Sequence, residues 1–127
     1  MTVKNYDFEV LASAARTAET LSNPFTNNYY KGLLLVVDAT IEVATAVLTP
    51  GIRVKDANGD YNTVYWDAAA AISAIGEYSY LFYPGLLAAD YGGTEALSLP
   101  APMEWKFIMA VGDADSMTYS VKGTYLL

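Results

Sequence analysis

The side chains that most often carry out chemistry in proteins are absent or scattered in this sequence. It contains no histidine and no cysteine, so the usual proton shuttle at neutral pH, the thiolate nucleophile and the soft metal ligands are all missing. Glu42 and Glu104 are candidates for the paired carboxylates of a glycoside hydrolase, which lie about 5 to 10 Å apart across a sugar. A small β-rich chain with its acids mostly in turns and on outward strand faces offers little of the dry, concave pocket that such catalysis needs. We expect no enzymatic activity.

The acidic turn Asp56-Ala57-Asn58-Gly59-Asp60 is a candidate cation site. Oxygen ligands at alternate positions around a glycine resemble the start of a calcium loop, but the twelfth position here is Asp67 instead of a glutamate, and no flanking helices are predicted. An exposed Asn-Gly hairpin turn explains the same residues. Asp113-Ala114-Asp115-Ser116 allows the same two interpretations. We expect plain turns in both places and no cofactor.

The charge balance argues against two classes of partner. The 127 residues include 14 acidic and 7 basic side chains, for a formal net charge of −7. Binding to nucleic acid and to anionic lipid is driven by lysine and arginine, so neither is expected. No stretch approaches the roughly 20 apolar residues of a membrane-spanning helix, and the opening residues lack the pattern of a signal peptide. We expect one domain that is synthesised in the cytoplasm.

Alternation of apolar and polar residues predicts an all-β fold. The Asn58-Gly59 pair predicts a hairpin, and Gly112-Asp113-Ala114-Asp115 predicts a second hairpin at the C-terminus. The predicted fold class is a single antiparallel β-sandwich, jelly-roll or immunoglobulin-like, of about seven to eight short strands with an extended N-terminal arm. The predicted strands are residues 6–10, 31–41, 52–55, 61–66, 77–83, 103–111 and 116–125.

Several segments are assigned by weaker signals. The run 31–41 is the most apolar and β-branched, which predicts a central strand covered on both faces. Residues 11–20 are expected to be mostly loop and 86–102 a long connection, whereas the alanines of 68–75 favour a short helix by propensity alone. We divide the chain into an N-terminal strand and arm, residues 1–28, and a sandwich domain, residues 29–127.

The aromatic residues provide the best functional signal. The chain has 11 tyrosines, which supply the large amphipathic area that anchors protein interfaces or stacks on sugars. Strand alternation predicts a core set, Tyr78, Tyr80 and Phe82, and it places Met103 on the apolar face of the strand that contains Trp105. Tyr29 and Tyr30, in a polar segment, and Tyr91, in a Gly-rich connection, form the predicted contact set.

A set of short motifs resembles a family of small proteins encoded in the structural-gene modules of tailed bacteriophages. The similarity covers about residues 27–127, and the family carries no enzymatic motif that could be transferred. It also favours strand and turn over helix for the segment matching Ala68 to Gly76. The matching elements are a Gly-rich entry to an apolar strand ending in Asp38-Ala39-Thr40, the turn Tyr83-Pro84-Gly85-Leu86, Pro100 before the strand with Trp105, and Asp113-Ala114-Asp115-Ser116-Met117-Thr118-Tyr119-Ser120-Val121.

The resemblance implies a virion structural protein, foremost a decoration or cement protein on the capsid surface. Its implied partner is the major capsid protein, and it implies a homo-oligomer, with a trimer favoured by analogy. We expect the N-terminal segment to reach a neighbour, either by pairing residues 6–10 with another sheet edge or by packing Phe25. The predicted partner-contact residues are Tyr6, Phe8, Phe25, Tyr29, Tyr30 and Tyr91.

Two other functions stay open on the sequence. One is a tail- or fibre-associated virion protein. The other is a carbohydrate-binding sandwich, in which Tyr29, Tyr30 or Trp66 would form a stacking platform and the Asp56 turn would hold calcium.

Overall fold

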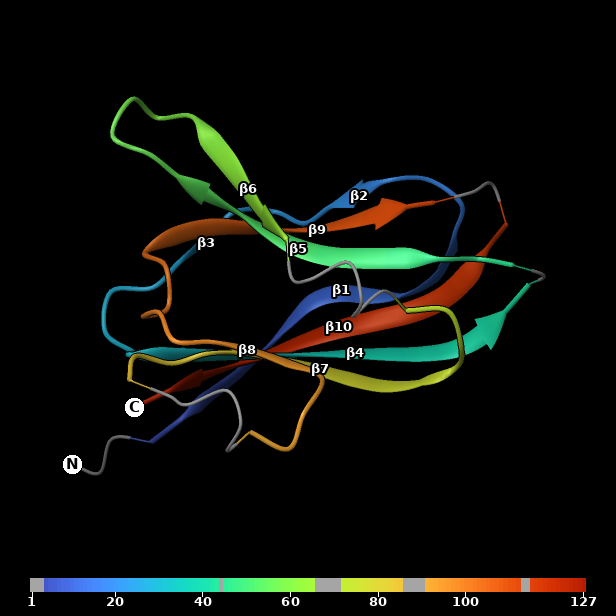
Figure 1. The fold of residues 1–127 in the computed structure, drawn as a ribbon. Helices are drawn as coiled ribbons and strands as arrows, with labels where there is room; N and C mark the ends of the chain where they lie inside the picture. Colours follow the sequence, from blue (N-terminus) through green and yellow to red (C-terminus); the bar gives the residue numbers. More distant parts are fainter. Residues whose placement is uncertain (1–3, 44, 66–71, 86–90, 113–114) are drawn as a thin grey trace.

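The regular structure of the chain consists of β-strands in two facing sheets (Figure 1). The computed structural model describes residues 4–43, 45–65, 72–85, 91–112 and 115–127, and it contains no helix within them. The predicted all-β sandwich is therefore confirmed. The strands are β1 (Tyr6–Arg16), β2 (Thr20–Leu21), β3 (Phe25–Thr26), β4 (Gly32–Glu42), β5 (Leu48–Lys55), β6 (Tyr61–Tyr65), β7 (Gly76–Phe82), β8 (Glu95–Leu97), β9 (Glu104–Val111) and β10 (Met117–Leu126).

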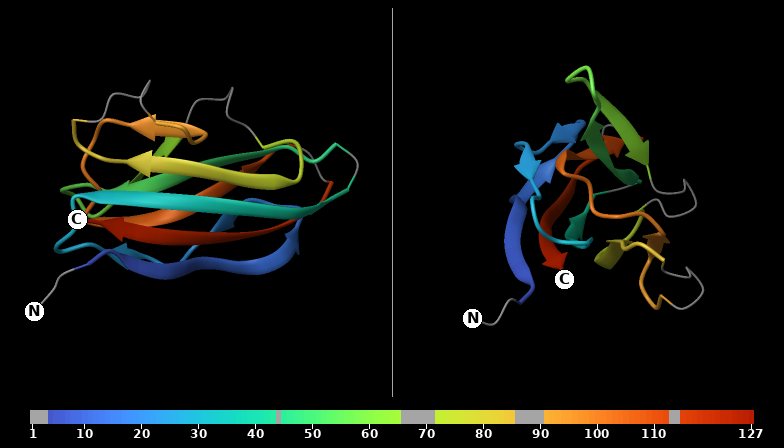
Figure 2. Two further views of the ribbon diagram at one scale, coloured as in Figure 1. Left: turned by 90° about the horizontal axis from the view of Figure 1, so that it is seen from below. Right: turned by 90° about the vertical axis from the view of Figure 1, so that its left-hand side faces the viewer.

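The two sheets differ in the strands that form their edges. The first sheet has the order β1-β10-β4-β7-β8, and the second has the order β2-β9-β5-β6, with β3 also pairing with β9. Every pair is antiparallel except β7 and β8, which run parallel. Figure 2 shows the two layers from below and from one end. Within the described strands, β1 is the outer strand on one side of the first sheet.

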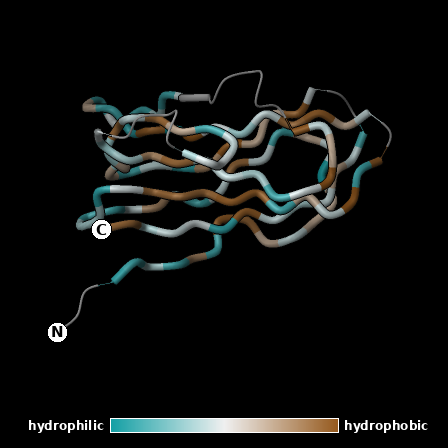
Figure 3. Tube along the Cα trace, turned by 60° about the horizontal axis from the view of Figure 1, so that its bottom comes forward, coloured by the Kyte–Doolittle hydropathy of each residue, from teal (hydrophilic) through white to brown (hydrophobic). Residues whose placement is uncertain are grey.

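Strand β4 lies in the middle of the first sheet, between β10 and β7, and its alternating apolar residues face the second sheet. Leu33, Leu35 and Val37 are fully buried, whereas Leu34 and Val36, on the opposite face, are half-buried. The central position is as predicted, but the strand is covered completely on one face only. Figure 3 shows the resulting hydrophobic stretches along the long strands, with hydrophilic residues toward the connections.

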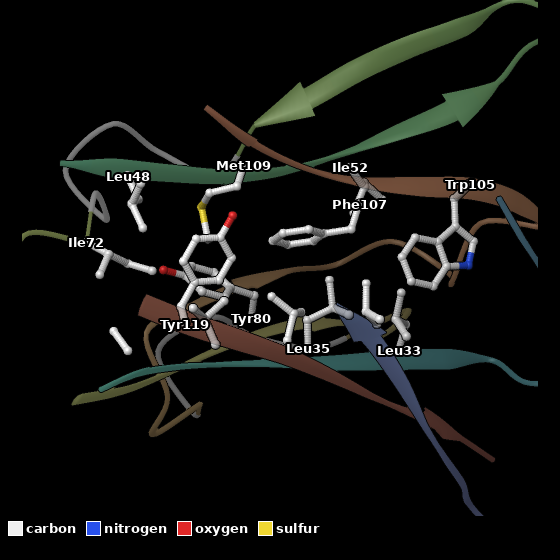
Figure 4. Packing of buried hydrophobic residues seen from close by; sticks show 14 of the residues in the cluster. Leu33, Leu35, Leu48, Ile52, Ile72, Tyr80, Trp105, Phe107, Met109 and Tyr119 are labelled. Atoms are coloured by element: carbon white, nitrogen blue, oxygen red, sulfur yellow. The ribbon is translucent and has the colours of Figure 1, made fainter. Parts of the chain in front are cut away.

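The core lies between the sheets, where side chains from both layers interdigitate (Figure 4). Leu35, Tyr80 and Tyr119 of the first sheet meet Phe107 and Met109 of the second. Tyr80 and Phe82 are buried, and Tyr78 packs against the cluster, so the predicted aromatic core set is confirmed. Burial of such side chains stabilises the fold by about 1.5 to 3 kcal/mol each.

The predicted C-terminal hairpin is wrong. Strands β9 and β10 lie in opposite sheets, with β9 paired to β5 and β10 paired to β1 and β4. In each of these strands every second side chain is apolar and buried. The two rows of buried side chains pack against each other, so the strands lie face to face in opposite sheets instead of edge to edge in one sheet. The hairpin of β5 and β6 is as predicted, with Gly59 at a φ of 87°.

Three segment assignments also change. Residues 11–16, expected to be loop, continue β1, and the expected connection 86–102 contains β8. Strand β5 begins at Leu48, four residues before the predicted start at residue 52. In the alanine-rich segment, residues 66–71 lie outside the described part of the chain, and Ile72 forms a β-bridge with Leu48.

The N-terminal segment contributes to both sheets. Strand β1 pairs with β10 from Tyr6 to Arg16, and β2 and β3 add to the edge of β9. The buried Ser22 fixes this crossing, because its hydroxyl accepts the backbone N–H of Phe107 at 2.8 Å and donates to the carbonyl of Asn23. Residues 6–26 thus build part of the sandwich.

Candidate functional site

Five of the six predicted contact residues gather at one end of the sandwich, where β1 and β3 begin and β10 ends. The ring of Phe8 lies at the centre of this group, with its centroid 5.2 Å from that of Phe25, 4.6 Å from Tyr125 and 6.1 Å from Tyr6. These distances fall in the range of favourable aromatic pairs. Strands that are distant in the sequence therefore bring one continuous aromatic cluster to this end.

The base of the cluster is buried and connects the two sheets. Trp105 of β9 is completely buried and stacks on Phe25 at a centroid distance of 4.9 Å. Its indole N–H donates to the hydroxyl of Tyr125 at 3.0 Å, which joins the second sheet to the first. Burial raises the pKa of the Tyr125 phenol, and the hydrogen bond from Trp105 opposes that rise. The phenol stays neutral and serves as an acceptor.

A glycine makes room for the central ring. Phe8 on β1 is directly opposite Gly123 on β10, and a Cβ atom added to Gly123 would lie 2.5 Å from the ζ-carbon of Phe8. The ring therefore occupies the space that any other residue at position 123 would fill. This cross-strand pair fixes Phe8 against Tyr125, and hence the start of β1 against the sandwich.

A second set of hydrogen bonds positions the tyrosine pair. Asn27 is buried, and its side-chain oxygen accepts the backbone N–H groups of Tyr29 and Tyr30 at 3.2 and 2.9 Å. Its side-chain N–H donates to the carbonyl of Tyr30, and its backbone N–H donates to the carbonyl of Met103. Asn27 is thus a positioning residue that the sequence analysis did not identify. Its signal was an asparagine two residues before an aromatic pair, the pattern of an Asx turn.

The two tyrosines have different exposures. Tyr30 is half-buried and stacks on Tyr125 at 5.4 Å with an interplanar angle of 8°, whereas Tyr29 is 64% exposed and meets Tyr30 edge to face. Tyr6 is also exposed, at 57%. These rings border an open groove of about 270 Å³ that is lined by Tyr6, Thr26, Asn27, Asn28, Tyr29, Tyr30 and Tyr125.

Exposed aliphatic side chains lie at the same end of the sandwich, where backbone hydrogen bonds join Asn27 to Met103 and Ala101 to Lys31. Met103 is 68% exposed and Leu99 is 52% exposed, and they line an apolar hollow of about 370 Å³ with Val54 and Phe82. The prediction that Met103 shares the buried face of β9 is wrong, because β9 begins at Glu104, after Pro102. The sequence feature that could have indicated the exposure of Leu99 and Met103 is their position next to the prolines of 99–103. We define the end surface as Tyr6, Tyr29, Leu99, Met103 and Leu127, all of which are exposed.

The two chain ends are tied together beside the end surface. The backbone N–H of Leu127 donates to the side-chain oxygen of Asn5 at 3.1 Å, and the hydroxyl of Tyr83 donates to the carbonyl of Leu127 at 2.8 Å. The side chain of Leu127 is 43% exposed. The end surface therefore rests on a hydrogen-bonded frame.

The sixth predicted contact residue lies elsewhere. Tyr91 lies beside Gly93 in the connection before β8, and its hydroxyl donates to the hydroxyl oxygen of Ser79 on β7 at 2.8 Å. It is half-buried and joins the connection before β8 to the outer face of β7. Tyr91 is thus separate from the end surface.

In the candidate cation turn, residues 56–60, the first carboxylate accepts hydrogen bonds from the hairpin itself. Oδ1 of Asp56 accepts the backbone N–H groups of Asn58 and Asp60, and Oδ2 accepts the side-chain N–H of Asn62 at 2.8 Å. These bonds, that from Asn62 foremost, lower the pKa of Asp56. In the second acidic turn, Asp115 accepts the backbone N–H and the hydroxyl of Thr45, while residues 113–114 lie outside the described part. No group of three acidic side chains that could hold a metal occurs among the described residues.

The two candidate hydrolase acids are not brought together. Glu104 begins β9 beside the end surface and forms an ion pair with Lys55 at 3.0 Å. Glu42 ends β4, opposite Met117, at the other end of the sandwich (Figure 1). The chemistry that these two residues could share is therefore excluded by their positions. Trp66, a candidate for sugar stacking, lies outside the described residues.

The buried phenols predict how stability depends on pH. Burial raises the pKa of Tyr80, Tyr119 and Tyr125 above the ordinary value. A raised folded-state pKa contributes stability that is fully present below the unfolded value, about 10, and is lost as the pH rises through the folded values. With no histidine or cysteine to titrate, we expect a melting temperature that is nearly constant from about pH 6 to 9 and falls above about pH 10.

Circular dichroism melts combined with phenolate absorbance test this expectation. Tyr80→Phe should remove one of the titrating phenols and move the onset of alkaline unfolding to higher pH. A melting temperature that falls steeply between pH 7 and 9 would contradict it.

The fold and its surface define the class of protein: a two-sheet β-sandwich with an aromatic end surface. No protein-family model matches the sequence, and no curated protein is significantly similar to it. Within the described residues, no helix has the length and apolarity needed to cross a membrane.

Solved structures of a virus share this fold. A chain in the structure of infectious bursal disease virus, Gx strain, is 11% identical with a TM-score of 0.51, and the match covers 98% of this chain and 32% of that one. A chain in the structure of the Gt strain is 12% identical with the same TM-score, covering 97% and 33%. This chain thus spans about a third of the length of each. At such identities the likeness shows the fold alone.

Proposed function

We propose that this chain is a non-enzymatic structural protein of a tailed-bacteriophage virion, a decoration protein that binds the outer face of the head shell and stabilises it. The observation that carries the proposal is the end surface. Exposed aromatic and aliphatic side chains stand there on a fixed aromatic base, which is the arrangement of a protein interface. The motifs shared with phage structural-module proteins supply the phage context.

The fold supports the same role by analogy. The likeness to chains in structures of a virus extends over nearly all of this sandwich. A likeness of fold alone supports the proposal of a virion component but identifies no partner. The partner in the proposal, the major capsid protein, therefore comes from the sequence resemblance.

The proposed role also fits the energetics of the surface. A shell offers many equivalent sites, and a symmetric oligomer that occupies several of them sums modest contacts into firm attachment. The proposal includes a homo-oligomer, with a trimer as the analogous case.

Binding to heads that lack the protein tests the proposal. We expect the double variant Tyr29→Ser with Met103→Ser to reduce the occupancy of sedimented heads at least about tenfold, because interface energy is concentrated in a few apolar anchors. Ile41→Ser is the matched control, since Ile41 is 57% exposed on β4, which ends at the opposite end of the sandwich. Unchanged occupancy of the double variant would overturn the proposal. Binding of the unsubstituted protein to tails instead of heads would favour a tail or fibre location.

Deleting residues 1–28 would not be a clean test. That deletion removes β1, β2 and β3 together, so it uncovers the edge of β9 at Trp105 and Ile108 as well as the edge of β10. Loss of binding would then follow from loss of the fold. The point substitutions on the end surface leave the core intact.

One observation favours carbohydrate binding as the second candidate. The groove places the exposed ring of Tyr29 beside the polar side chains of Asn28 and Thr26, which is a mixture of stacking and hydrogen-bonding groups suited to a saccharide. A glycan array decides between the two. Saccharide binding that Tyr29→Ser abolishes, together with unchanged attachment to heads, would support this candidate.

A further inference from the structure

Within the described residues, the outer edge of β1 pairs with no other strand. The regularity of its pairing with β10 on the other side changes along its length. From Tyr6 to Glu9 the register against β10 is regular, running from Tyr125 to Lys122. Beyond Glu9 the register shifts twice, between Glu9 and Leu11 and between Leu11 and Ala14. Bulges of this kind twist an edge and protect it from further pairing. The regular stretch, residues 6–9, is therefore the part that can accept another strand.

The bulged half is held in its irregular shape by one side chain. The guanidinium of Arg16 donates to the carbonyl oxygens of Ala14 on β1 and of Tyr119 on β10, at 3.3 and 2.8 Å. It also lies 4.5 Å from the centroid of the Tyr119 ring. A regular partner strand cannot follow β1 through this region without loss of these contacts.

The side chains on the open stretch alternate strictly between two chemistries. Tyr6 and Phe8 belong to the aromatic cluster on the inner face, whereas Asp7 and Glu9 are exposed on the outer face. Asp7 accepts the Thr124 hydroxyl at 2.7 Å, and a hollow of about 540 Å³ beside the edge is lined by Asp7, Glu9, Val36, Lys122 and Thr124 together with Phe8 and Gly123. Lys122 is directly opposite Glu9 in the register with β10, so this face carries two acids on β1 and one base on β10, and it has space for a long side chain.

Those two acids disfavour pairing of this stretch with the same stretch of a second copy. Antiparallel pairing of two β1 edges places outer-face residues opposite outer-face residues, so Asp7 would meet Asp7 or Glu9 of the other copy. Like charges directly opposite each other destabilise a strand pair. A partner strand with positive charge at alternate positions would instead place its cations beside Asp7 and Glu9, on the side of β1 away from Lys122 of β10.

We propose that residues 6–9 of β1 form a strand-addition site for an extended segment of another protein in which lysine or arginine alternates with apolar residues. The basic side chains lie against Asp7 and Glu9, and the apolar ones continue the aromatic cluster at Tyr6. Backbone hydrogen bonds supply affinity, and the alternation supplies specificity, as in other cases of strand addition. The inference does not depend on the virion role, because it concerns any protein with such a segment.

A synthetic peptide of alternating lysine and valine, with blocked ends, tests the site. We expect binding in low salt to shift the backbone NMR signals of residues 6–9 and to leave those of β6 and β8 unchanged. Glu9→Lys should weaken binding about tenfold, since an attraction is replaced by a repulsion. Glu77→Lys is the matched control, because Glu77 is an exposed acid on β7 of the same sheet.

Two further peptides separate strand addition from general charge attraction. One has the same composition with its lysines in a single block, and the other has every second backbone nitrogen methylated. Both should bind at least about tenfold more weakly than the alternating peptide. Equal binding of either one, or no binding of the alternating peptide, would overturn the inference. Neither result would bear on attachment to heads, which the end-surface variants measure separately.

Discussion

Trp105→Ala should lower the free energy of unfolding by about 3 to 5 kcal/mol, the usual loss for a buried large aromatic residue. Trp105 is completely buried, stacks on Phe25 and donates to Tyr125. For a domain of this size the loss corresponds to a fall of about 11 to 19 °C in melting temperature. Thermal and urea unfolding, followed by circular dichroism, measure it.

Milder variants keep this prediction testable if the alanine variant fails to fold. Trp105→Phe retains a ring but removes the indole N–H, so it should cost less, and a double-mutant cycle with Tyr125→Phe should return a coupling of about 1 kcal/mol for the hydrogen bond. Met103→Ala is the control, because Met103 is 68% exposed two residues away and its loss should change stability little. Additive effects of Trp105→Phe and Tyr125→Phe would contradict the assigned bond.

Gly123→Ala is the second substitution with a large expected effect, about 1 to 3 kcal/mol of destabilisation for the addition of one methyl group. The new Cβ would lie 2.5 Å from the ring of Phe8, which must then leave its stack on Tyr125. The start of β1 would shift with the ring, so the aromatic cluster would be disturbed as well. Chemical unfolding gives the loss of stability. Tryptophan fluorescence, to which Trp105 contributes together with Trp66, reports the disturbance of the cluster.

Two comparisons isolate the steric cause. Gly92→Ala makes the same chemical change where no atom lies within 4 Å, so it should alter stability by less than about 0.5 kcal/mol. In a Phe8→Ala background the cost of Gly123→Ala should largely disappear, because the clashing ring is gone. A cost that persists in that background would show that the backbone, not Phe8, requires glycine at position 123.

The strands could be predicted from the sequence because each long strand carries its own alternating row of apolar residues. Leu33, Leu35 and Val37 specify the inner face of β4 without reference to any other strand. The pairing of β9 and β10 could not be predicted in this way, because the alternating rows of a hairpin and of two facing strands are the same. A hairpin and a pair of facing strands differ in which apolar row packs against which other row. That choice depends on the packing of the whole sandwich.

The candidate site was predicted in part for similar reasons. The exposure of Tyr29 follows from its polar neighbours, and the burial of Tyr80 follows from its position in a strand. The convergence of Phe8, Phe25 and Tyr125 depends on contacts between distant segments, which no local pattern contains. Tyr91 is engaged by Ser79 for the same reason, although its Gly-rich surroundings indicate exposure.

The pairing of the first strand with the last has a consequence for the way in which this protein folds. Tyr6 is opposite Tyr125, so the edge of the first sheet joins segments nearly the full length of the chain apart. Closing so long a loop is slow compared with forming a hairpin, and it must wait until the C-terminal strand has been synthesised. Until then β1 is a free strand with Phe8 and Val10 uncovered, which is the kind of species that associates with other chains. We expect refolding to be slow and its yield to fall as the protein concentration rises.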